Sequence, residues 1–598
     1  MALLGILSIL QAWFLPGILF VLFFKNIKIL DNLVISVPLS LVLNYILVYI
    51  LVNFKIYNQK IFLLIITLEI ILIISILLKR YKWKELLDKI DNWFSLDRSK
   101  NVLKIDISLL NFLILFLLII YVFYALKNLG QSVHVGDPLD MWNKWAMLWS
   151  KNTIPYTTEY PQAVPILYSI SYILLNSYEV EFFTSAVCLI YPIWIFVTFF
   201  RLIYIFPEKK LLIKLSLITT TFFILSILRN YSLFIGYSDP ILILTSTSAA
   251  FIFIYNYFEN ENKNIVNEND LKNLVLISLI AVAPAITKQM GLLISYIFPI
   301  FFFLINFLEK KILYKDTIII SCIIFVISIS WYIFPFYHYY QLDFETTKFA
   351  RLASQSLTGT ELSNQSFLAK LSFGLDSLFW HFKYLVVILI LFSLKNKFAV
   401  KVFLLIVLPY FIIWSLFFVV DARNFVMVSP FLGLLLSIGL INIIKLSAFF
   451  NFKFIKNLKI ILLGSVAVLI IISIHTIKND EKIISKSIES KKLRGNQEIN
   501  ILLYNTFNYS KPDFDIISIP DVDFSYLPII GERIIETSCD NFDMFISSRN
   551  ISKSFYLLIN NKFCNIKKLF KEKKSNLELI KVFNHKNYIF YYLKSKSL

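Results

Sequence analysis

The dominant pattern along the chain is a series of apolar windows, each about 20 residues long and nearly free of charge. Windows of this length are long enough to cross a hydrocarbon layer about 30 Å thick as helices. Membrane-spanning strands would alternate apolar and polar residues, and these windows do not. The pattern therefore predicts about 14 transmembrane helices. The expected segments are roughly 2–24, 33–54, 61–79, 105–126, 179–206, 211–229, 240–258, 273–287, 290–308, 316–336, 376–394, 402–420, 425–445 and 460–476.

The distribution of Lys and Arg orients these helices. The loop from Lys79 to Lys104 is rich in basic residues, which the positive-inside rule places in the cytoplasm. Counting crossings from there puts the polar regions 127–162 and 337–376 and the tail after residue 477 on the outer side. This topology requires that the apolar stretch 163–176 does not cross, since it suits a re-entrant or interfacial helix better than a span.

The C-terminal tail has a different pattern. Short apolar runs at 499–504 and 588–593 resemble strands, and the charged stretch 566–573 resembles a helix. The predicted fold is thus an all-α polytopic membrane protein with a small C-terminal α/β soluble domain. Its expected parts are N-terminal transmembrane helices at 1–104, a central transmembrane domain at 105–476 and an outer soluble domain at 477–598.

Composition supports a membrane protein and narrows the choice of partners. Of 598 residues, 58% are hydrophobic and only 16% are charged, a balance that soluble enzymes of this size do not show. The net charge of +19 would suggest nucleic acid in a soluble protein, but here cytoplasmic loops and anionic lipid headgroups account for it. We therefore expect membrane lipid as a partner and no nucleic acid.

The segment 135–167 is the most informative part of the sequence. Asp137 and Asp140 lie just beyond the outer end of a predicted helix, where they could cap the next helix, deprotonate a hydroxyl group or hold a metal ion. Three tryptophans then follow at helical spacing: Trp142, Trp145 and Trp149. The spacing predicts a short amphipathic helix at the membrane interface, with its tryptophans at headgroup level.

Further polar residues lie at outer helix ends or in outer loops of the same topology. Any one of them alone is typical of a solvated loop residue, but their gathering on one side of the membrane favours a site. These residues are Asp239, Lys288, Gln289, His338, Arg351, Asp421, Arg423 and Asn424.

Several short motifs resemble those of GT-C membrane glycosyltransferases, especially the branch of protein O-mannosyltransferases and lipopolysaccharide-core galacturonosyltransferases. The matching elements in order are Asp140-Met141-Trp142, Lys151, Glu159-Tyr160-Pro161 and the runs GYSDP, TKQMG and DARNF. Two positions depart from the family pattern, since Leu139 replaces a Trp and Glu159 replaces the more usual Asp. The resemblance covers roughly residues 105–445 and implies a GT-C-like catalytic domain there.

The resemblance also implies an activity, namely transfer of a sugar from a polyprenyl-phosphate donor to a hydroxyl group of a glycan, lipid or protein, with inversion. Asp140 would be the general base, Asp137 would orient it or help to hold a divalent cation, and Glu159 is a second candidate base. Whether Mg²⁺ or Mn²⁺ is used stays open, and Asp137 and Asp140 are its candidate ligands. Arg423, Lys288 and Tyr160 would bind the donor phosphate.

Two other classes of membrane protein share part of this pattern. A polymerase or ligase of polyprenyl-linked polysaccharide would also have a large outer loop, and a transporter or lipid flippase would also have many helices. Transporters usually show repeats and charged groups near the bilayer midplane, whereas few residues such as Glu69 lie within a window here. The favoured interpretation is a multi-pass glycosyltransferase of the cell (plasma or inner) membrane whose active site faces the non-cytoplasmic side.

Overall fold

The computed structural model divides into two compact units, one comprising residues 1–133 and 152–480 and the other 134–151 and 481–598. The residues it describes are 1–23, 29–80, 142–155, 161–177, 181–204, 238–261, 271–308, 318–330, 366–379, 383–417, 422–449, 516–519, 534–536, 555–560, 577–585 and 588–595, with single residues around 116–126, 471–478 and 502–507.

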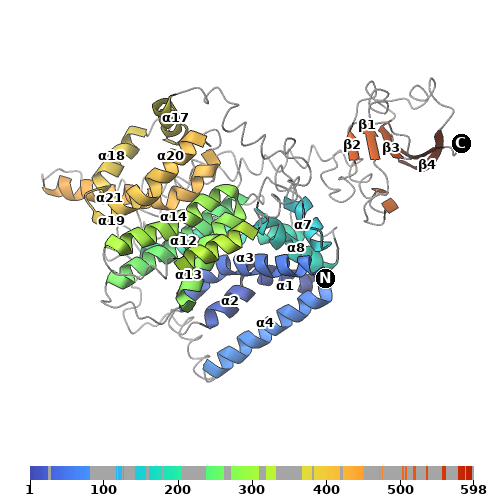
Figure 1. Ribbon diagram of the computed structural model, residues 1–598, viewed down its shortest axis with the longest axis horizontal. Coiled ribbons are helices and arrows are strands. Elements are labelled where there is room, and N and C mark those ends of the chain that lie inside the picture. The colour runs from blue at the N-terminus through green and yellow to red at the C-terminus, as the bar shows by residue number, and fades with distance from the viewer. Residues whose placement is uncertain are drawn as a thin grey trace. The chain divides into compact units, whose positions relative to one another are not determined.

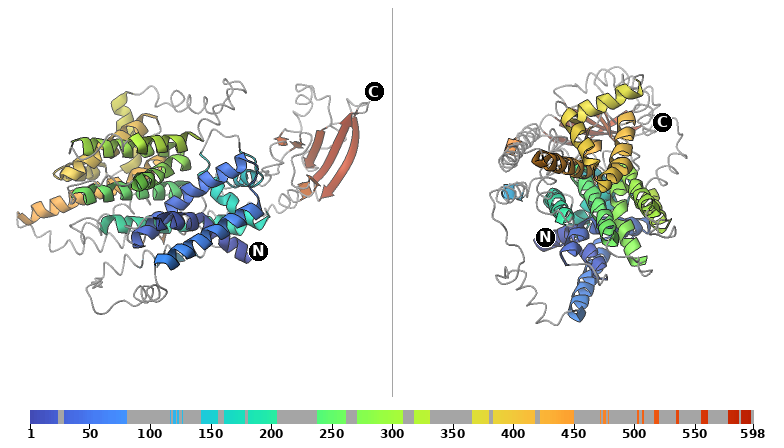
Figure 2. Two further views of the ribbon diagram at one scale, coloured as in Figure 1. Left: turned by 60° about the horizontal axis from the view of Figure 1, so that its bottom comes forward. Right: turned by 90° about the vertical axis from the view of Figure 1, so that its left-hand side faces the viewer.

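The larger unit is a bundle of helices, many of which run side by side (Figures 1 and 2). Its elements are α1 (Ala2–Trp13), α2 (Leu15–Leu22), α3 (Ile29–Asn53), α4 (Gln59–Arg80), α8 (Ala163–Leu175), α9 (Glu181–Val187), α10 (Ile190–Tyr204), α12 (Ser238–Glu261), α13 (Leu271–Thr287), α14 (Gln289–Leu308), α17 (Phe367–Phe379), α18 (Lys383–Ser393), α19 (Lys397–Val402), η4 (Phe403–Val407), α20 (Leu408–Phe417), η5 (Ala422–Val428) and α21 (Ser429–Phe449).

Several of these helices are long and apolar enough to cross a membrane. Within the described residues there are four such segments, or six if two pairs of helices separated by a short break each count as one span. The four are Leu33–Asn53, Gln59–Lys79, Lys397–Leu416 and Asn424–Ile443. The prediction of a mostly helical, multi-pass membrane protein is confirmed, while the number of about 14 spans stays a prediction.

Some predicted spans are interrupted in the structure. The window 2–24 forms α1 and α2, which meet at an angle of 48°. Pro16 lies at the start of α2, where its missing N–H is tolerated, but it could not continue α1 without losing a hydrogen bond. The window 179–206 is likewise divided into α9 and α10, and the window 376–394 corresponds to the end of α17 followed by α18.

Helix α8 matches the short stretch that was expected not to cross. At 13 residues it extends about 20 Å, which is less than the hydrocarbon thickness. All of its residues are buried, whereas a helix lying in the membrane interface would expose one face. It is therefore an interior helix, and it ends at Asn176, whose left-handed backbone (φ 48°) is a common helix terminator.

The tryptophans do not form the exposed face expected of an amphipathic helix, while the position of this helix relative to the membrane stays a prediction. The segment forms α7 (Lys144–Ser150), and Trp142, Trp145 and Trp149 are all buried, with at most 8% exposure. The rings of Trp142 and Trp145 pack edge to face, with centroids 5.3 Å apart. Helical spacing of aromatic residues suits an interior helix as well as an amphipathic one, so the sequence pattern did not separate these alternatives.

The C-terminal unit contains a five-stranded sheet in the order β2-β1-β3-β5-β4. The strands are β1 (Ile516–Ile519), β2 (Ile534–Glu536), β3 (Phe555–Asn560), β4 (Leu577–His585) and β5 (Tyr588–Ser595). Strand β1 is parallel to β2 and β3, whereas β5 is antiparallel to β3 and β4. The predicted strand at 588–593 is confirmed as part of β5, and the predicted helix at 566–573 lies outside the described residues.

The predicted strand at 499–504 is wrong, because Leu502 and Leu503 are helical. Leu503 is buried, and one turn later the ring of Phe507 lies 4.9 Å from that of Tyr556 on β3 and 6.1 Å from that of Phe590 on β5. Helical spacing therefore places two apolar side chains on one face, a requirement that a short apolar run does not reveal.

Close backbone contact holds α2 against α3. The amide N–H of Gly17 donates to Ser40 Oγ at 2.9 Å, and a Cβ atom at Gly17 would lie only 2.0 Å from the carbonyl oxygen of Ser36. No L-amino acid side chain fits at this distance unless the two helices separate.

We predict that Gly17→Ala lowers the stability of the protein by about 1–3 kcal/mol, because the added methyl group forces α2 away from α3. Thermal unfolding of the purified protein in detergent measures this effect. Ala2→Val, an enlargement at an exposed position of α1, is the control and should change stability little. Equal stability of Gly17→Ala and wild type would contradict the close packing.

Candidate functional site

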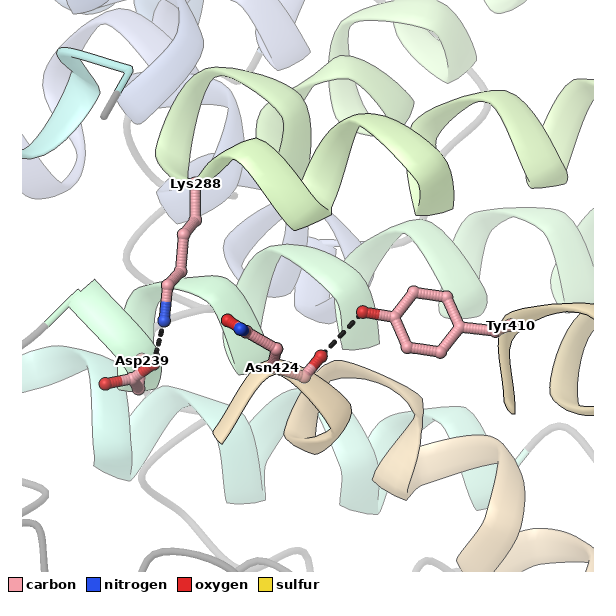
Figure 3. Close-up of polar contacts among 4 residues, drawn as sticks. All are labelled: Asp239, Lys288, Tyr410 and Asn424. Atoms are coloured by element: carbon pink, nitrogen blue, oxygen red, sulfur yellow. Dashed lines mark hydrogen bonds and ion pairs between the residues drawn. The ribbon is translucent and has the colours of Figure 1, made fainter. Parts of the chain in front are cut away.

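A buried ion pair lies among the apolar helices of the larger unit. Lys288 Nζ donates to Asp239 Oδ1 at 2.9 Å (Figure 3). Asp239 is 2% exposed and Lys288 is 6% exposed. Transferring two charges out of water is costly, and mutual pairing offsets much of that cost. Both residues were predicted as site candidates from their separate positions at helix ends, and the structure brings them together.

Asp239 lies in the first turn of α12, directly before Pro240. A carboxylate is stabilised there, because the unpaired backbone N–H groups give the start of a helix a partial positive charge. Proline suits the same turn because it has no N–H to leave unpaired. The local sequence Ser238-Asp239-Pro240 therefore begins α12 and fixes the carboxylate at its end.

Lys288 occupies the single residue between α13 and α14. Its backbone is held from both sides, since its N–H donates to Pro284 O at 3.2 Å and its carbonyl accepts from Gly291 N at 2.9 Å. A Cβ atom at Gly291 would lie 1.9 Å from Pro284 O, so only glycine permits α13 and α14 to approach this closely. The tight connection gives Lys288 one defined position.

Asn424 is a third polar group of the site. It lies in η5, and Figure 3 shows its side-chain amide directed toward the side of Lys288 and Asp239. Its backbone carbonyl accepts a hydrogen bond from the hydroxyl group of Tyr410 at 2.6 Å. Its side-chain Oδ1 is buried and has no hydrogen-bond partner within the part of the chain that the structure describes.

Aromatic side chains support η5 next to Asn424. The ring of Phe425 lies 5.8 Å from that of Tyr410, 5.2 Å from that of Trp414 and 6.1 Å from that of Phe411. Tyr410 and Trp414 are fully buried. These contacts join η5 to α20 and leave the backbone around Asn424 little freedom to move.

Three segments that are distant in sequence thus converge. Helix α12 packs against α13, α14 and η5. The runs GYSDP, TKQMG and DARNF, noted separately in the sequence, contribute Asp239, Lys288 and Asn424 respectively. An ammonium group held by a carboxylate, with an amide on the same side, can bind an anion and hydrogen-bond to a polar neighbour of that anion.

The structure describes only some of the other residues that were predicted for this site. Gln289 is the first residue of α14 and is partly buried, and Arg423 lies in η5, where only its backbone is described. The remaining candidates lie outside the described residues, so their roles stay predictions: Asp137, Asp140, Glu159, Tyr160, His338, Arg351 and Asp421. Tyr410 was not predicted as a candidate. Asn424 was noted in the DARNF run as one of the polar residues at outer helix ends, but no role was assigned to it.

No metal site is defined by the residues that the structure describes. Among them, no three His, Cys, Asp or Glu side chains lie close enough to hold an ion. The proposed ligands Asp137 and Asp140 are not among these residues.

Lys151 follows α7 and is partly buried. Burial lowers the pKa of its ammonium group to about 8, because removal from water disfavours the charged form. Lys151 therefore changes charge near physiological pH.

Comparison with known proteins finds solved structures of similar fold, among them two of the protein ArnT. Neither a protein-family model nor a curated protein matches the sequence. The crystal structure of ArnT from Cupriavidus metallidurans bound to undecaprenyl phosphate matches 80% of this chain and 97% of the ArnT chain. The crystal structure of the same protein in the apo state matches 81% of this chain and 98% of the ArnT chain. Sequence identity is 9% and 10%, and the TM-scores are 0.47 and 0.46. Similarity at this sequence identity and TM-score does not indicate which reaction the chain catalyses.

We predict that Lys288→Met destabilises the protein by about 3–5 kcal/mol, because it removes the cation that pairs with the buried carboxylate of Asp239. The double variant Lys288→Met, Asp239→Leu should recover much of this loss, since it removes both charges of the pair. Denaturant or thermal unfolding in detergent measures both. Lys383→Met is the control, because its partner Asp376 is exposed and their ion pair contributes little. Equal effects at Lys288 and Lys383 would contradict the assignment of a buried pair.

We predict that stability rises with pH between about 8 and about 10.4, the ordinary pKa of lysine, through Lys151. In this window the unfolded chain binds a proton at Lys151 that the folded chain has released, so raising the pH favours folding. Lys151→Met should reduce this slope, whereas Lys55→Met, at an exposed position, should not. Unfolding in detergent at several pH values measures the slope, and identical slopes for all three proteins would contradict the lowered pKa.

Proposed function

We propose that this chain is an integral membrane glycosyltransferase of the GT-C class. It takes a sugar from a polyprenyl-phosphate carrier and transfers it to an acceptor hydroxyl on the non-cytoplasmic face of the membrane. The observation that carries the proposal is the convergence of Asp239, Lys288 and Asn424 from three separate motif runs inside an apolar helical unit.

The chemistry of the pair suits a lipid phosphate. A lysine ammonium has three N–H donors, so it can contact a carboxylate such as Asp239 and a phosphate oxygen at the same time. Lys288 can therefore hold a phosphate oxygen while Asp239 keeps it in position. Its charge interacts strongly with an anion because the surroundings are apolar and poor in water. An apolar helical unit is also where a polyprenyl chain would be bound.

The reaction would proceed in one displacement. Asp140 accepts the proton of the acceptor hydroxyl, whose oxygen attacks the anomeric carbon of the sugar. The bond between that carbon and the phosphate oxygen breaks, and its electron pair stays on the polyprenyl phosphate. Lys288, together with Arg423, would neutralise the charge that develops there. Attack from the face opposite the phosphate inverts the anomeric carbon.

A transporter is the second candidate, and one buried polar group favours it. Glu69 lies in α4 and is 9% exposed, and its buried Oε2 has no hydrogen-bond partner within the described residues. An ionisable residue inside a membrane helix often marks an ion or proton path. Transport of a labelled polyprenyl-phosphate sugar across proteoliposomes without any transfer to an acceptor would favour this alternative.

We predict that Asp140→Asn lowers the rate of sugar transfer by about 10²- to 10⁴-fold, because the amide keeps the shape of the side chain but cannot accept the proton. Radiolabelled sugar passing from polyprenyl phosphate to membrane glycan or lipid measures the rate. Asp376→Asn, at an exposed carboxylate, is the control and should keep activity. If Asp140→Asn is active and Glu159→Gln is inactive, Glu159 is the base. If wild type transfers no sugar from any polyprenyl phosphate, the proposed function is wrong.

A further inference from the structure

The side-chain amide of Asn424 has an unsatisfied acceptor. Its Oδ1 is buried and accepts no hydrogen bond within the described part of the chain. Most buried polar atoms in proteins do have a partner, so an orphaned acceptor of this kind requires an explanation. A bound ligand that donates a hydrogen bond would supply one.

The backbone that carries this amide is held in place. The backbone carbonyl of Asn424 accepts from the hydroxyl group of Tyr410 at 2.6 Å, and the ring of the next residue, Phe425, packs against Trp414. From this fixed backbone the side-chain amide is directed toward the side of Lys288 and Asp239 (Figure 3). Such preorganisation is typical of a group that recognises a ligand.

We propose that Asn424 is a specificity-determining residue that binds the sugar of the donor. Its Oδ1 would accept a hydrogen bond from a hydroxyl or amino group of the sugar, while Lys288 holds the phosphate to which that sugar is attached. This inference rests on the proposed function. The match is chemical, because a glycosyl phosphate carries hydrogen-bond donors as well as an anionic group, and the site offers an acceptor amide directed toward the side of a cation (Figure 3).

The inference gives Asn424 a different role from Lys288. Lys288 would bind any polyprenyl phosphate, whether or not it carries a sugar, since it interacts with charge. Asn424 would contribute only when a sugar is present. The ratio of the affinity for a sugar-linked lipid to the affinity for undecaprenyl phosphate therefore reports the contribution of Asn424. A change that affects only binding of the phosphate cancels in this ratio.

The test measures dissociation constants of the full-length protein in lipid nanodiscs. The probes are undecaprenyl phosphate and the same lipid carrying glucose, arabinose or 4-amino-4-deoxyarabinose. The preference is the ratio of the dissociation constant of undecaprenyl phosphate to that of the sugar-linked lipid that wild type binds most tightly. We expect Asn424→Leu to lower this preference by about 3- to 10-fold. Asn424→Asp should keep the preference, because a carboxylate oxygen also accepts a hydrogen bond. The double variant Lys288→Met, Asp239→Leu, which is expected to recover much of the stability that Lys288→Met loses, should weaken binding of all four lipids.

Each result decides the matter. An unchanged preference in Asn424→Leu overturns the inference. A wild type that prefers no sugar-linked lipid overturns it too. In both cases the proposed function stays intact if binding of undecaprenyl phosphate depends on Lys288. If wild type binds none of the four lipids, the proposed function fails as well. Thermal unfolding establishes that each variant is folded. If Asn424→Leu is not, Asn424→Ala removes the amide without adding volume, and the same criterion applies to it.

Discussion

The requirement that a charge in an apolar interior have a partner governs the arrangement of the helical unit. Lys288 and Asp239 are both nearly inaccessible, so neither could be buried without the other at an acceptable cost. Their 2.9 Å contact fixes the start of α12 against the connection between α13 and α14. Helix η5 packs on α12 and so places Asn424 near this pair. The geometry of the candidate site thus follows from one electrostatic constraint.

The same constraint appears in the N-terminal helices. Gln11 of α1 donates from Nε2 to Asn44 Oδ1 at 3.1 Å, and Asn44 of α3 donates back to the carbonyl oxygen of Gln11 at 2.9 Å. At the start of α4, Gln59 Nε2 donates to the carbonyl oxygen of Leu174 in α8 at 2.6 Å. Among the apolar side chains of α4 only Phe62 and Ile66 are buried, so apolar packing alone would not fix its rotation. Hydrogen bonds between helices orient it instead, as is common where the surrounding lipid is as apolar as the side chains.

The sequence predicted those features that depend on the length and polarity of a single segment. Helices α3, α4, α12, α13 and α14 lie close to their predicted windows, because spanning a hydrocarbon layer requires long runs of apolar residues. The bend at Phe14 and the burial of Trp149 depend on neighbouring elements, which the windows do not contain. The site shows the same division. Asp239, Lys288 and Asn424 were all noted as polar residues at helix ends. The pairing of the two charges is tertiary, however, and nothing in the sequence assigned a role to the neutral amide of Asn424.

Stability does not explain why an ion pair occupies this position. A buried pair contributes little net stability, and apolar residues of similar volume often stabilise a protein as well or better. Contacts such as that of Gly17 with Ser40 show that this bundle can join two helices without any charge. The pair does provide a cation held in a site poor in water, and an amide directed toward its side has an acceptor without a partner in the described part of the chain. Recognition of an anionic ligand that also donates hydrogen bonds requires this combination, whereas helix packing does not.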